Sequence, residues 1–294
     1  MSSRYHPRTP MEPTTVFLHI PKTGGTSLRS LFEDHYGDRL LRVYRSGPEP
    51  RVHPDDVPGL PEEQRAVDAV FGHFAFGIHT DLPRPVRYVT VLRDPVMRVV
   101  SHYYLYVRRL AKGIAAGTRL EKAIAAGDVS LADFARGDLP RRGERAGPPP
   151  SQNLMTRFVS GNYPHCPAAP DDPALLEQAQ QNVRELFLAV GLTESLPRFV
   201  SLLGRELGWK NIPDLERKNV NPKRPDREAL DAGTLAAIRE HNTLDLALYD
   251  FITEITNGGT RLAPGVGVRH GLLRRRQGPA RKGRAGATPS TVEQ

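Results

Sequence analysis

The sequence predicts an α/β protein with three layers, α/β/α, in which helices cover both faces of a central parallel sheet. Short apolar runs near 15–20, 67–73, 87–92 and 186–191 have the length of buried strands. Segments with helical periodicity lie between and after them, near 26–35, 95–110, 118–126, 151–160, 173–184, 194–208 and 228–254. Strands that alternate with helices in this way favour a parallel sheet that is buried on both sides.

Length and composition are those of an ordinary soluble domain. The chain has 294 residues, of which 38% are hydrophobic and 25% charged, enough for one domain of about 250 residues. No run approaches the ~18 apolar residues of a membrane span, and residues 1–10 lack the apolar core of a secretory signal. The single cysteine excludes an internal disulfide and fits a reducing compartment. We therefore expect a cytoplasmic protein.

The basic charge of the chain is concentrated at its end. Residues 258–294 hold eight basic residues and one acidic residue, a net of +7, which leaves +1 of the total of +8 for the rest. We expect a flexible N-terminus over 1–13, one folded domain over 14–256 and a basic, disordered tail over 257–294. Within the domain, the proline-rich stretches 44–65 and 137–150 are predicted to be loops.

The first strand leads directly into a glycine loop and a helix. Such a unit cradles phosphate, because glycines let the backbone approach the ligand and the helix N-terminus carries partial positive charge. In the nucleoside-triphosphate loop G-x-x-x-x-G-K-[ST], aligned on Gly25 and Ser27, glycine and lysine would stand at 20 and 26, where this chain has Ile20 and Thr26. The lysine of this loop is Lys22 instead. The loop therefore keeps the phosphate cradle without the lysine that a triphosphate requires.

A second phosphate site is predicted after the 87–92 strand. Arg93 stands at the carboxyl end of that strand, and Asp94 and Pro95 suit the N-cap and first position of a helix. Arg98 and Ser101 then share one helix face. A guanidinium and a hydroxyl placed in this way can together hold a terminal phosphate.

The two motifs together resemble those of sulfotransferases that use 3′-phosphoadenosine 5′-phosphosulfate (PAPS). The resemblance implies a P-loop-like fold without a metal cofactor. It places the 5′-phosphosulfate on the loop and the 3′-phosphate on Arg93 and Ser101. Lys22 would act in catalysis, and the cofactor-binding residues of the loop would be Lys22, Thr23, Gly24, Gly25, Thr26 and Ser27.

A third segment indicates a subfamily. The predicted strand 67–73 ends in Gly72 and His73, which resembles the catalytic region of heparan sulfate 2-O-sulfotransferase and its relatives. The resemblance implies that His73 is the general base, a role that suits an imidazole titrating near neutrality. The alternative is a core histidine among phenylalanines. Rival bases are His19, His79, His102 and Glu33.

The resemblance extends over roughly 14–256, apart from 40–65 and 109–150. The late basic segment 217–225 resembles a loop that folds over the cofactor, so Lys218, Asn219 and Arg224 are further candidates for cofactor contact, with a solvated turn as the alternative. Because animal relatives carry a Golgi anchor, we expect a bacterial member. The implied partner is a hydroxyl-bearing acceptor on a sugar, a glycolipid or a metabolite.

Two other classes of function remain open at this point. A P-loop-type nucleotide or small-molecule kinase would share the fold, but should have lysine at 26 and a magnesium-binding acid on a strand. A non-catalytic polyanion-binding protein would depend on the basic tail, which could also touch nucleic acid or an anionic membrane. The sequence shows no specific nucleic-acid motif, and it leaves the oligomeric state open.

Overall fold

A computed structural model describes residues 12–45, 50–114, 118–138, 149–163, 169–210, 212, 224–256 and 260–262. Its centre is a sheet with the strand order β2-β3-β1-β4-β5-β6. The strands are β1 (Thr14–Leu18), β2 (Leu40–Val43), β3 (Ala69–Gly72), β4 (Val86–Leu92), β5 (Phe187–Leu192) and β6 (Thr260–Leu262). The first five strands pair in parallel, and β6 pairs antiparallel with β5. The predicted α/β class and parallel sheet are therefore confirmed.

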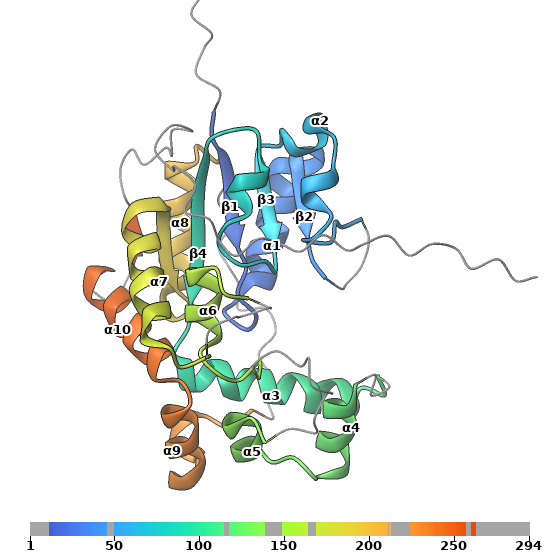
Figure 1. Cartoon of the computed structure of the whole chain (residues 1–294), viewed down its shortest axis with the longest axis vertical. Coiled ribbons are helices and arrows are strands. Elements are labelled where there is room, and N and C mark those ends of the chain that lie inside the picture. The colour runs from blue at the N-terminus through green and yellow to red at the C-terminus, as the bar shows by residue number, and fades with distance from the viewer. Residues whose placement is uncertain are drawn as a thin grey trace, which may run out of the picture.

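Helices cover both faces of the sheet (Figure 1). One face is packed by α6 (Leu154–Ser160), α7 (Pro173–Leu186) and α10 (Thr243–Thr256). The other face is packed by α1 (Gly25–Tyr36) and α8 (Leu196–Glu206). Strand β1 supplies both cores, because its side chains alternate: Val16 and Leu18 point to the first and Phe17 to the second.

A third apolar cluster lies outside the sheet. It joins α3 (Pro95–Ala111), α4 (Arg119–Ala126), α5 (Leu131–Arg136) and α9 (Ala232–Glu240). Figure 1 shows these four helices together below the sheet. Thr118 and Ser130 cap α4 and α5 with capping boxes, which fixes where these two short helices begin. Helix α3 thus connects the sheet to a small helical lobe.

The predicted helix over 228–254 is wrong in one respect, because the chain forms two helices there. A 3-10 turn over Arg227–Ala229 is followed by α9 and, after a break at His241 and Asn242, by α10. The buried Asn242 side chain donates to the carbonyl oxygen of Ile238 (2.9 Å) and accepts from the backbone N–H of Asn153 (3.1 Å). An asparagine that bonds the backbone in this way competes with the helical ladder, which explains the break.

Other predicted elements are present with shifted ends, and some elements were not predicted. The helix expected over 151–160 begins at Leu154, because Asn153 adopts a left-handed conformation (φ 42°). Strands β2 and β6, helix α5 and the single turn α2 (Glu62–Arg65) were not predicted. The predicted boundary at 256 stays a prediction, and β6 lies beyond it in the segment assigned to the tail.

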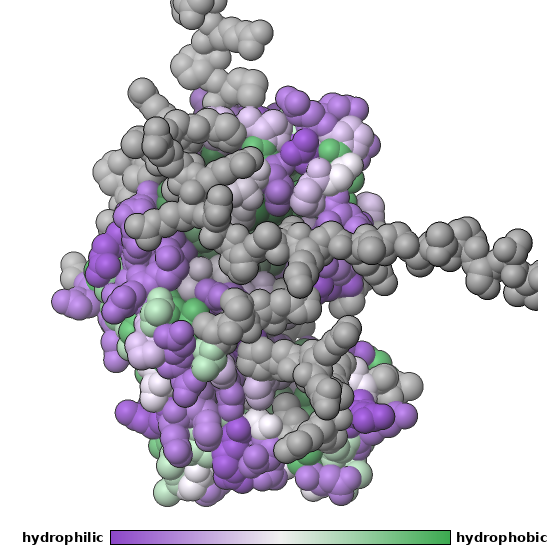
Figure 2. Space-filling view, in the orientation of Figure 1, coloured by the Kyte–Doolittle hydropathy of each residue, from purple (hydrophilic) through white to green (hydrophobic). Residues whose placement is uncertain are grey.

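The part of the surface that is coloured in Figure 2 is mostly hydrophilic, with small separated apolar areas. Among the described residues, Ile114 is the one large hydrophobic side chain that is exposed. No helix within the described ranges is long and apolar enough to cross a membrane.

Candidate functional site

The predicted phosphate loop follows β1 and is tied to the ends of β4 and β5. Lys22 and Gly24 both have positive φ, 75° and 90°, so the chain turns sharply before α1 begins at Gly25. The Thr193 hydroxyl, just after β5, lies 2.8 Å from the Thr23 carbonyl oxygen and 2.9 Å from that of Leu92. Thr193 therefore ties the loop to the carboxyl end of β4, where ligands bind in sheets of this kind.

Among the predicted loop residues, the hydroxyl groups differ in their surroundings. Thr23 is buried, and its hydroxyl donates to the Ile20 carbonyl oxygen (3.0 Å). Ser27 is buried in the first turn of α1, whereas Thr26 is exposed. The position where a triphosphate loop carries lysine thus holds a small side chain that faces solvent.

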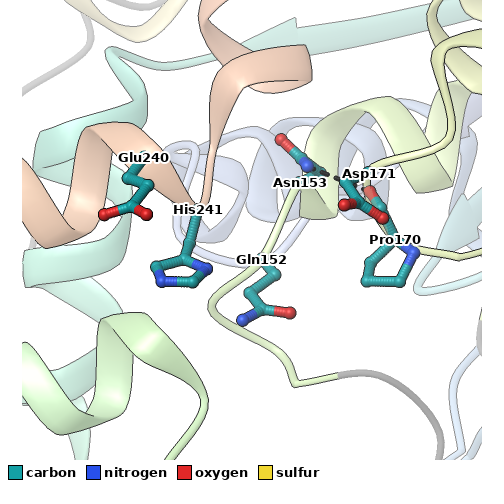
Figure 3. A pocket seen from close by; sticks show the side chains of 6 residues that line it. All are labelled: Gln152, Asn153, Pro170, Asp171, Glu240 and His241. Carbon is teal, nitrogen blue, oxygen red and sulfur yellow. Dashed lines mark hydrogen bonds between the residues drawn. The ribbon is translucent and has the colours of Figure 1, made fainter.

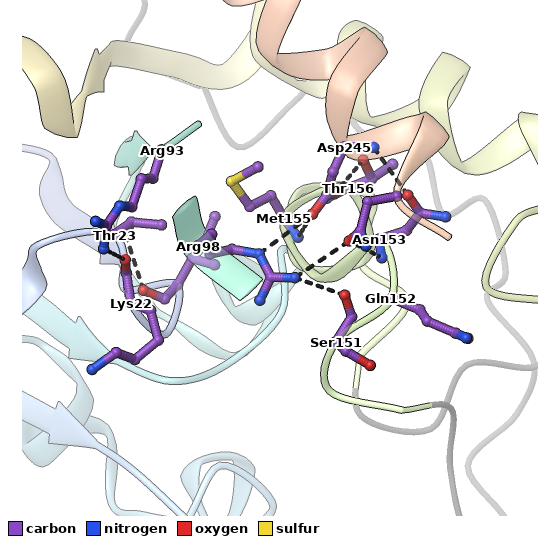
Figure 4. Close-up of polar contacts among 12 residues, drawn as sticks. Lys22, Thr23, Arg93, Arg98, Ser151, Gln152, Asn153, Met155, Thr156 and Asp245 are labelled. Carbon is purple, nitrogen blue, oxygen red and sulfur yellow. Dashed lines mark hydrogen bonds and ion pairs between the residues drawn. The ribbon is translucent and has the colours of Figure 1, made fainter. Parts of the chain in front are cut away.

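Arg93 lies directly beside this loop. Its Nη1 donates to the Lys22 carbonyl oxygen (3.1 Å), while the Lys22 side chain extends away from the guanidinium (Figure 4). The structure thus brings the two predicted phosphate sites together, although their residues stand 71 positions apart. Ser101 is buried on α3, and Asp94 caps that helix by accepting from Met97 N (2.9 Å), as predicted from the sequence.

Arg98 takes no part in this site. Its side chain is fully buried, and Nη2 donates to the Ser151 carbonyl oxygen (2.9 Å), while Nε lies 3.6 Å from Asp245 Oδ2 (Figure 4). These contacts join α3 to the segment before α6 and to α10. The arginine that shares the helix face of Ser101 therefore holds the fold together instead of facing the loop.

Four basic side chains influence one another at the loop. Burial, followed by the nearby charges of Arg108, Arg93 and Arg224, lowers the pKa of Lys22 to about 8. Burial and then the charge of Arg224 lower the pKa of Arg93 to about 10. Bringing like charges together is unfavourable unless an anion joins them. In addition, Arg224 Nε is buried and makes no hydrogen bond with the residues that the structure describes, which fits a missing anionic partner.

The segment that follows Arg224 is anchored to α3 through Arg227. The Arg227 guanidinium donates to Asp94 Oδ2 (2.9 Å), and the Asp94 backbone N–H donates to Glu194 (3.1 Å). Asp94 thus caps α3 with one oxygen and fixes the 224–229 segment with the other. Of the predicted late residues, Arg224 lies near the loop, while Lys218 and Asn219 lie outside the described residues.

His73 stands at the carboxyl end of β3. Gly72 allows this position, because a Cβ there would lie 1.7 Å from the Val43 carbonyl oxygen of β2. The Nδ1 atom of His73 lies 2.6 Å from the His19 carbonyl oxygen. Since a carbonyl oxygen can only accept, this bond assigns the proton of the neutral ring to Nδ1 and leaves Nε2 as an acceptor. Burial lowers the pKa of His73 to about 4, so the ring is neutral at pH 7.

The other four candidates for the base, His19, His79, His102 and Glu33, differ from His73 in their contacts and burial. His79 Nδ1 lies 2.8 Å from the Tyr88 hydroxyl, and Glu33 accepts from Arg42 Nη1 (2.9 Å). His102 is buried inside α3, where burial lowers its pKa to about 3. His19 lies beside His73, with ring centroids 4.2 Å apart. Glu33 and His79 are thus engaged by other side chains and His102 lies within α3, while His19 stays close to His73.

Three histidines, of which His19 and His102 are buried and His73 is half-buried, make the fold sensitive to acid. Burial lowers the pKa of His19, His73 and His102 below 6.5, with values of about 4 for His73 and about 3 for His102. As pH falls below 6.5, the unfolded chain binds protons that the folded chain does not. The free energy of unfolding should therefore fall by up to about 1.4 kcal/mol per pH unit for each histidine.

Urea unfolding between pH 7.5 and 4.5 measures this loss. Phenylalanine in place of His102 keeps an aromatic ring next to Tyr106 and Phe134. In this variant the unfolding free energy should fall less steeply with decreasing pH, by the contribution of one histidine. An unchanged slope in that variant would show that His102 is already charged in the folded protein.

A small cavity of about 110 Å³ lies elsewhere, between the segments before α6 and α7 and the end of α9 (Figure 3). It is lined by Gln152, Asn153, Pro170, Asp171, Glu240 and His241. None of these residues belongs to the loop or to the cationic group around it. No group of three or more potential metal ligands occurs in the described ranges.

Comparison of the sequence with known proteins identifies two similar sulfotransferases. No protein-family model matches the chain. It is 25% identical over 267 residues to heparan sulfate 2-O-sulfotransferase hst-2 of Caenorhabditis elegans, a match that covers 82% of this chain and 77% of that protein. It is also 25% identical over 260 residues to heparan sulfate 2-O-sulfotransferase 1 of Xenopus laevis, covering 81% and 69%. These matches support a sulfotransferase-like family.

Three residues of the site were not predicted from the sequence. Arg108 could have been found, because it stands seven positions after Ser101 and therefore on the same face of α3. Arg227 and Thr193 carry no local signal, since both act through partners far away in the chain.

Proposed function

We propose that the protein transfers a sulfuryl group from PAPS to a hydroxyl group of a carbohydrate or glycoconjugate. The observation that carries the proposal is the group of basic side chains gathered at the loop, Lys22, Arg93, Arg108 and Arg224, in which Arg93 bonds the Lys22 backbone. Burial first, and then the charges of the three arginines, lower the Lys22 pKa. Both compared relatives are named as heparan sulfate 2-O-sulfotransferases, which supports a sugar hydroxyl as the acceptor. Within this proposal, residues 14–256 form the catalytic domain.

The donor substrate would occupy the loop and the start of α3. The backbone amides of Gly24 to Ser27 and the N-terminus of α1 suit its 5′-phosphosulfate. Arg93 and Ser101 would hold the 3′-phosphate, with Arg224, and in the segment before it Lys218 and Asn219, as further contacts. Binding energy gained at the 3′-phosphate would orient the sulfur at the other end of the molecule.

Transfer would proceed in line. The acceptor oxygen forms a bond to sulfur while the bond between sulfur and the bridging oxygen of the 5′-phosphate breaks. His73 Nε2 takes the proton of the acceptor hydroxyl, which a neutral imidazole with its proton on Nδ1 can do. Negative charge develops on the departing 5′-phosphate, and the Lys22 ammonium would stabilise it. The products are the sulfated acceptor and 3′-phosphoadenosine 5′-phosphate.

A kinase function has less support. Position 26, where a triphosphate-binding loop has lysine, is an exposed threonine. Residue 26 therefore cannot supply the ammonium group that binds the β- and γ-phosphates. Calorimetric titration with 3′-phosphoadenosine 5′-phosphate and, separately, with ATP and Mg²⁺ distinguishes the two functions. We expect tight binding of the first and none of the second, and the reverse result would reject the proposal.

The reaction itself is tested with ³⁵S-labelled PAPS and extracts of the source organism, followed by mass spectrometry of the labelled product. The same assay on a chain without residues 263–294, which keeps strand β6, addresses the polyanion-binding alternative. We expect the shortened chain to transfer sulfate at an unchanged rate. Loss of all activity with the tail would favour a function based on the tail.

Arg93→Ala should weaken binding of 3′-phosphoadenosine 5′-phosphate. A hydrogen bond to a charged group contributes about 1.5–3 kcal/mol, so we expect the dissociation constant to rise by about 10- to 100-fold. Calorimetry measures this change. The control is Arg205→Ala, since Arg205 lies on the exposed surface of α8 and contacts Ser201. A dissociation constant that is the same in Arg93→Ala and Arg205→Ala would remove Arg93 from the donor site.

A further inference from the structure

His19 lies between the phosphate loop and His73, and neither motif accounts for it. Its side chain is 8% exposed, and its ring packs against the His73 ring at 4.2 Å with 31° between the planes. The Tyr44 hydroxyl lies 3.2 Å from His19 Nδ1. The Tyr44 ring meets the His73 ring edge-on at 4.9 Å. The His73 ring is thus enclosed by His19 on one side and Tyr44 on another.

Residue 19 holds His73 in two ways. Its carbonyl oxygen accepts from His73 Nδ1, which sets the tautomer, and its ring covers one face of the imidazole. The backbone is fixed at the same place, since His19 N donates to the Gly72 carbonyl oxygen (2.9 Å). The direction in which His73 Nε2 points therefore depends on where the His19 ring lies.

The position of the His19 ring depends in turn on Gly25. A Cβ at residue 25 would lie 1.9 Å from His19 Nε2 and 2.0 Å from Cδ2, far below the 3.0 Å that real Cβ contacts respect. Gly25 does not have positive φ, whereas Gly24 does, with φ 90°. The two glycines thus serve different purposes. Gly24 permits the turn of the loop, and Gly25 leaves room for the His19 ring.

We infer that His19 is a positioning residue, whose ring fills the space above Gly25 and thereby sets His73 relative to the phosphate loop. This inference rests on the proposed role of His73 as the base. The titratable and charged groups around the His19 ring are His73, Arg29, Lys22 and the neutral Tyr44 hydroxyl. Burial, and after it these neighbouring groups, lower the pKa of His19 well below 6.5, so His19 acts here as a neutral, shape-defining ring.

A double-mutant cycle tests the inference. Gly25→Ala should displace the His19 ring and with it His73, and a misplacement of this order costs about 10²-fold in turnover. In a His19→Ala background no imidazole occupies the space next to residue 25. Gly25→Ala should then lower turnover by no more than about a further twofold, which is the deviation from additivity usual for independent sites. His19→Phe keeps a ring in that space, so Gly25→Ala should remain damaging in that background.

Gly24→Ala is the matched control. It is strained by its backbone conformation and lies near Leu196 and Thr193, not near His19. Its loss of turnover should therefore be the same with and without the His19 ring. If Gly25→Ala behaves like Gly24→Ala, with equal losses in both backgrounds, then Gly25 serves the loop or the donor directly and the inference is wrong.

A second measurement does not depend on activity. Long-range ¹H–¹⁵N spectra report the tautomer and surroundings of the His73 ring. We expect Gly25→Ala to shift these signals in the wild-type background and to leave them unchanged in His19→Ala. Absence of that dependence in an active enzyme overturns the inference. If the His73 signals depend on the His19 ring but the protein transfers no sulfuryl group, the proposed function is refuted and the positioning role of His19 still holds.

Folding failure is also informative in this design. If Gly25→Ala alone does not fold, the double variant His19→Ala with Gly25→Ala should fold, because the conflict has been removed. A double variant that fails in the same way would contradict the inference.

Discussion

His73→Ala should lower the turnover of sulfuryl transfer by about 10²–10⁴-fold, the usual contribution of a general base. The reason is the hydrogen bond from Nδ1 to the His19 carbonyl oxygen, which leaves Nε2 free to accept the proton of the acceptor hydroxyl. Steady-state rates with saturating PAPS measure the loss. Calorimetry with 3′-phosphoadenosine 5′-phosphate should give an unchanged dissociation constant, because His73 does not belong to the basic group at the loop.

His79→Ala is the control for this variant. His79 also lies after β3, but it contacts Tyr88, so its removal should leave turnover near that of the wild type. Full activity in His73→Ala, or an equal loss in both variants, would remove the assignment of the base.

Lys22→Ala should lower turnover by about 10²–10³-fold, the cost of removing one donor that stabilises developing negative charge. Alanine keeps the Cβ, so the cost of the positive φ of 75° at this residue stays the same and the comparison isolates the ammonium group. Single-turnover rates measure the chemical step. Turnover should fall by a larger factor than binding of 3′-phosphoadenosine 5′-phosphate weakens. A change confined to binding would make Lys22 a binding residue only.

The pH dependence of kcat/KM gives a second test of Lys22. With a pKa of about 8, the ammonium loses its proton as pH rises through that value, so kcat/KM should decline above about pH 8. The His73 pKa of about 4 keeps the base neutral over this range and places the acid limb near pH 4. The alkaline limb should disappear in Lys22→Ala and persist in Lys122→Ala, since Lys122 is exposed on α4.

Strong local signals made much of the fold predictable. Strands β1 and β4 are rich in apolar and β-branched residues, with β1 buried throughout and β4 buried except at Arg87, and Asp94 with Pro95 marks the start of α3. Strand β2 was missed because it is short and contains Arg42, which pairs with Glu33. The break between α9 and α10 depends on the bonds of Asn242 to distant backbone, which periodicity does not contain.

By itself, the sequence determined the layer arrangement and the unit of strand, glycine loop and helix, because both depend on residue types at fixed spacing. Arg93 was a candidate from its place at the end of a strand, and His73 from the resemblance of its motif to that of sulfotransferases. Only the tertiary structure decided how these residues act together. It turned Arg98 inward to Asp245, brought Arg108 and Arg224 to Lys22, and set the His73 tautomer through the His19 carbonyl. The physical reason is that charge repulsion, desolvation and hydrogen-bond direction depend on distances between segments far apart in the chain.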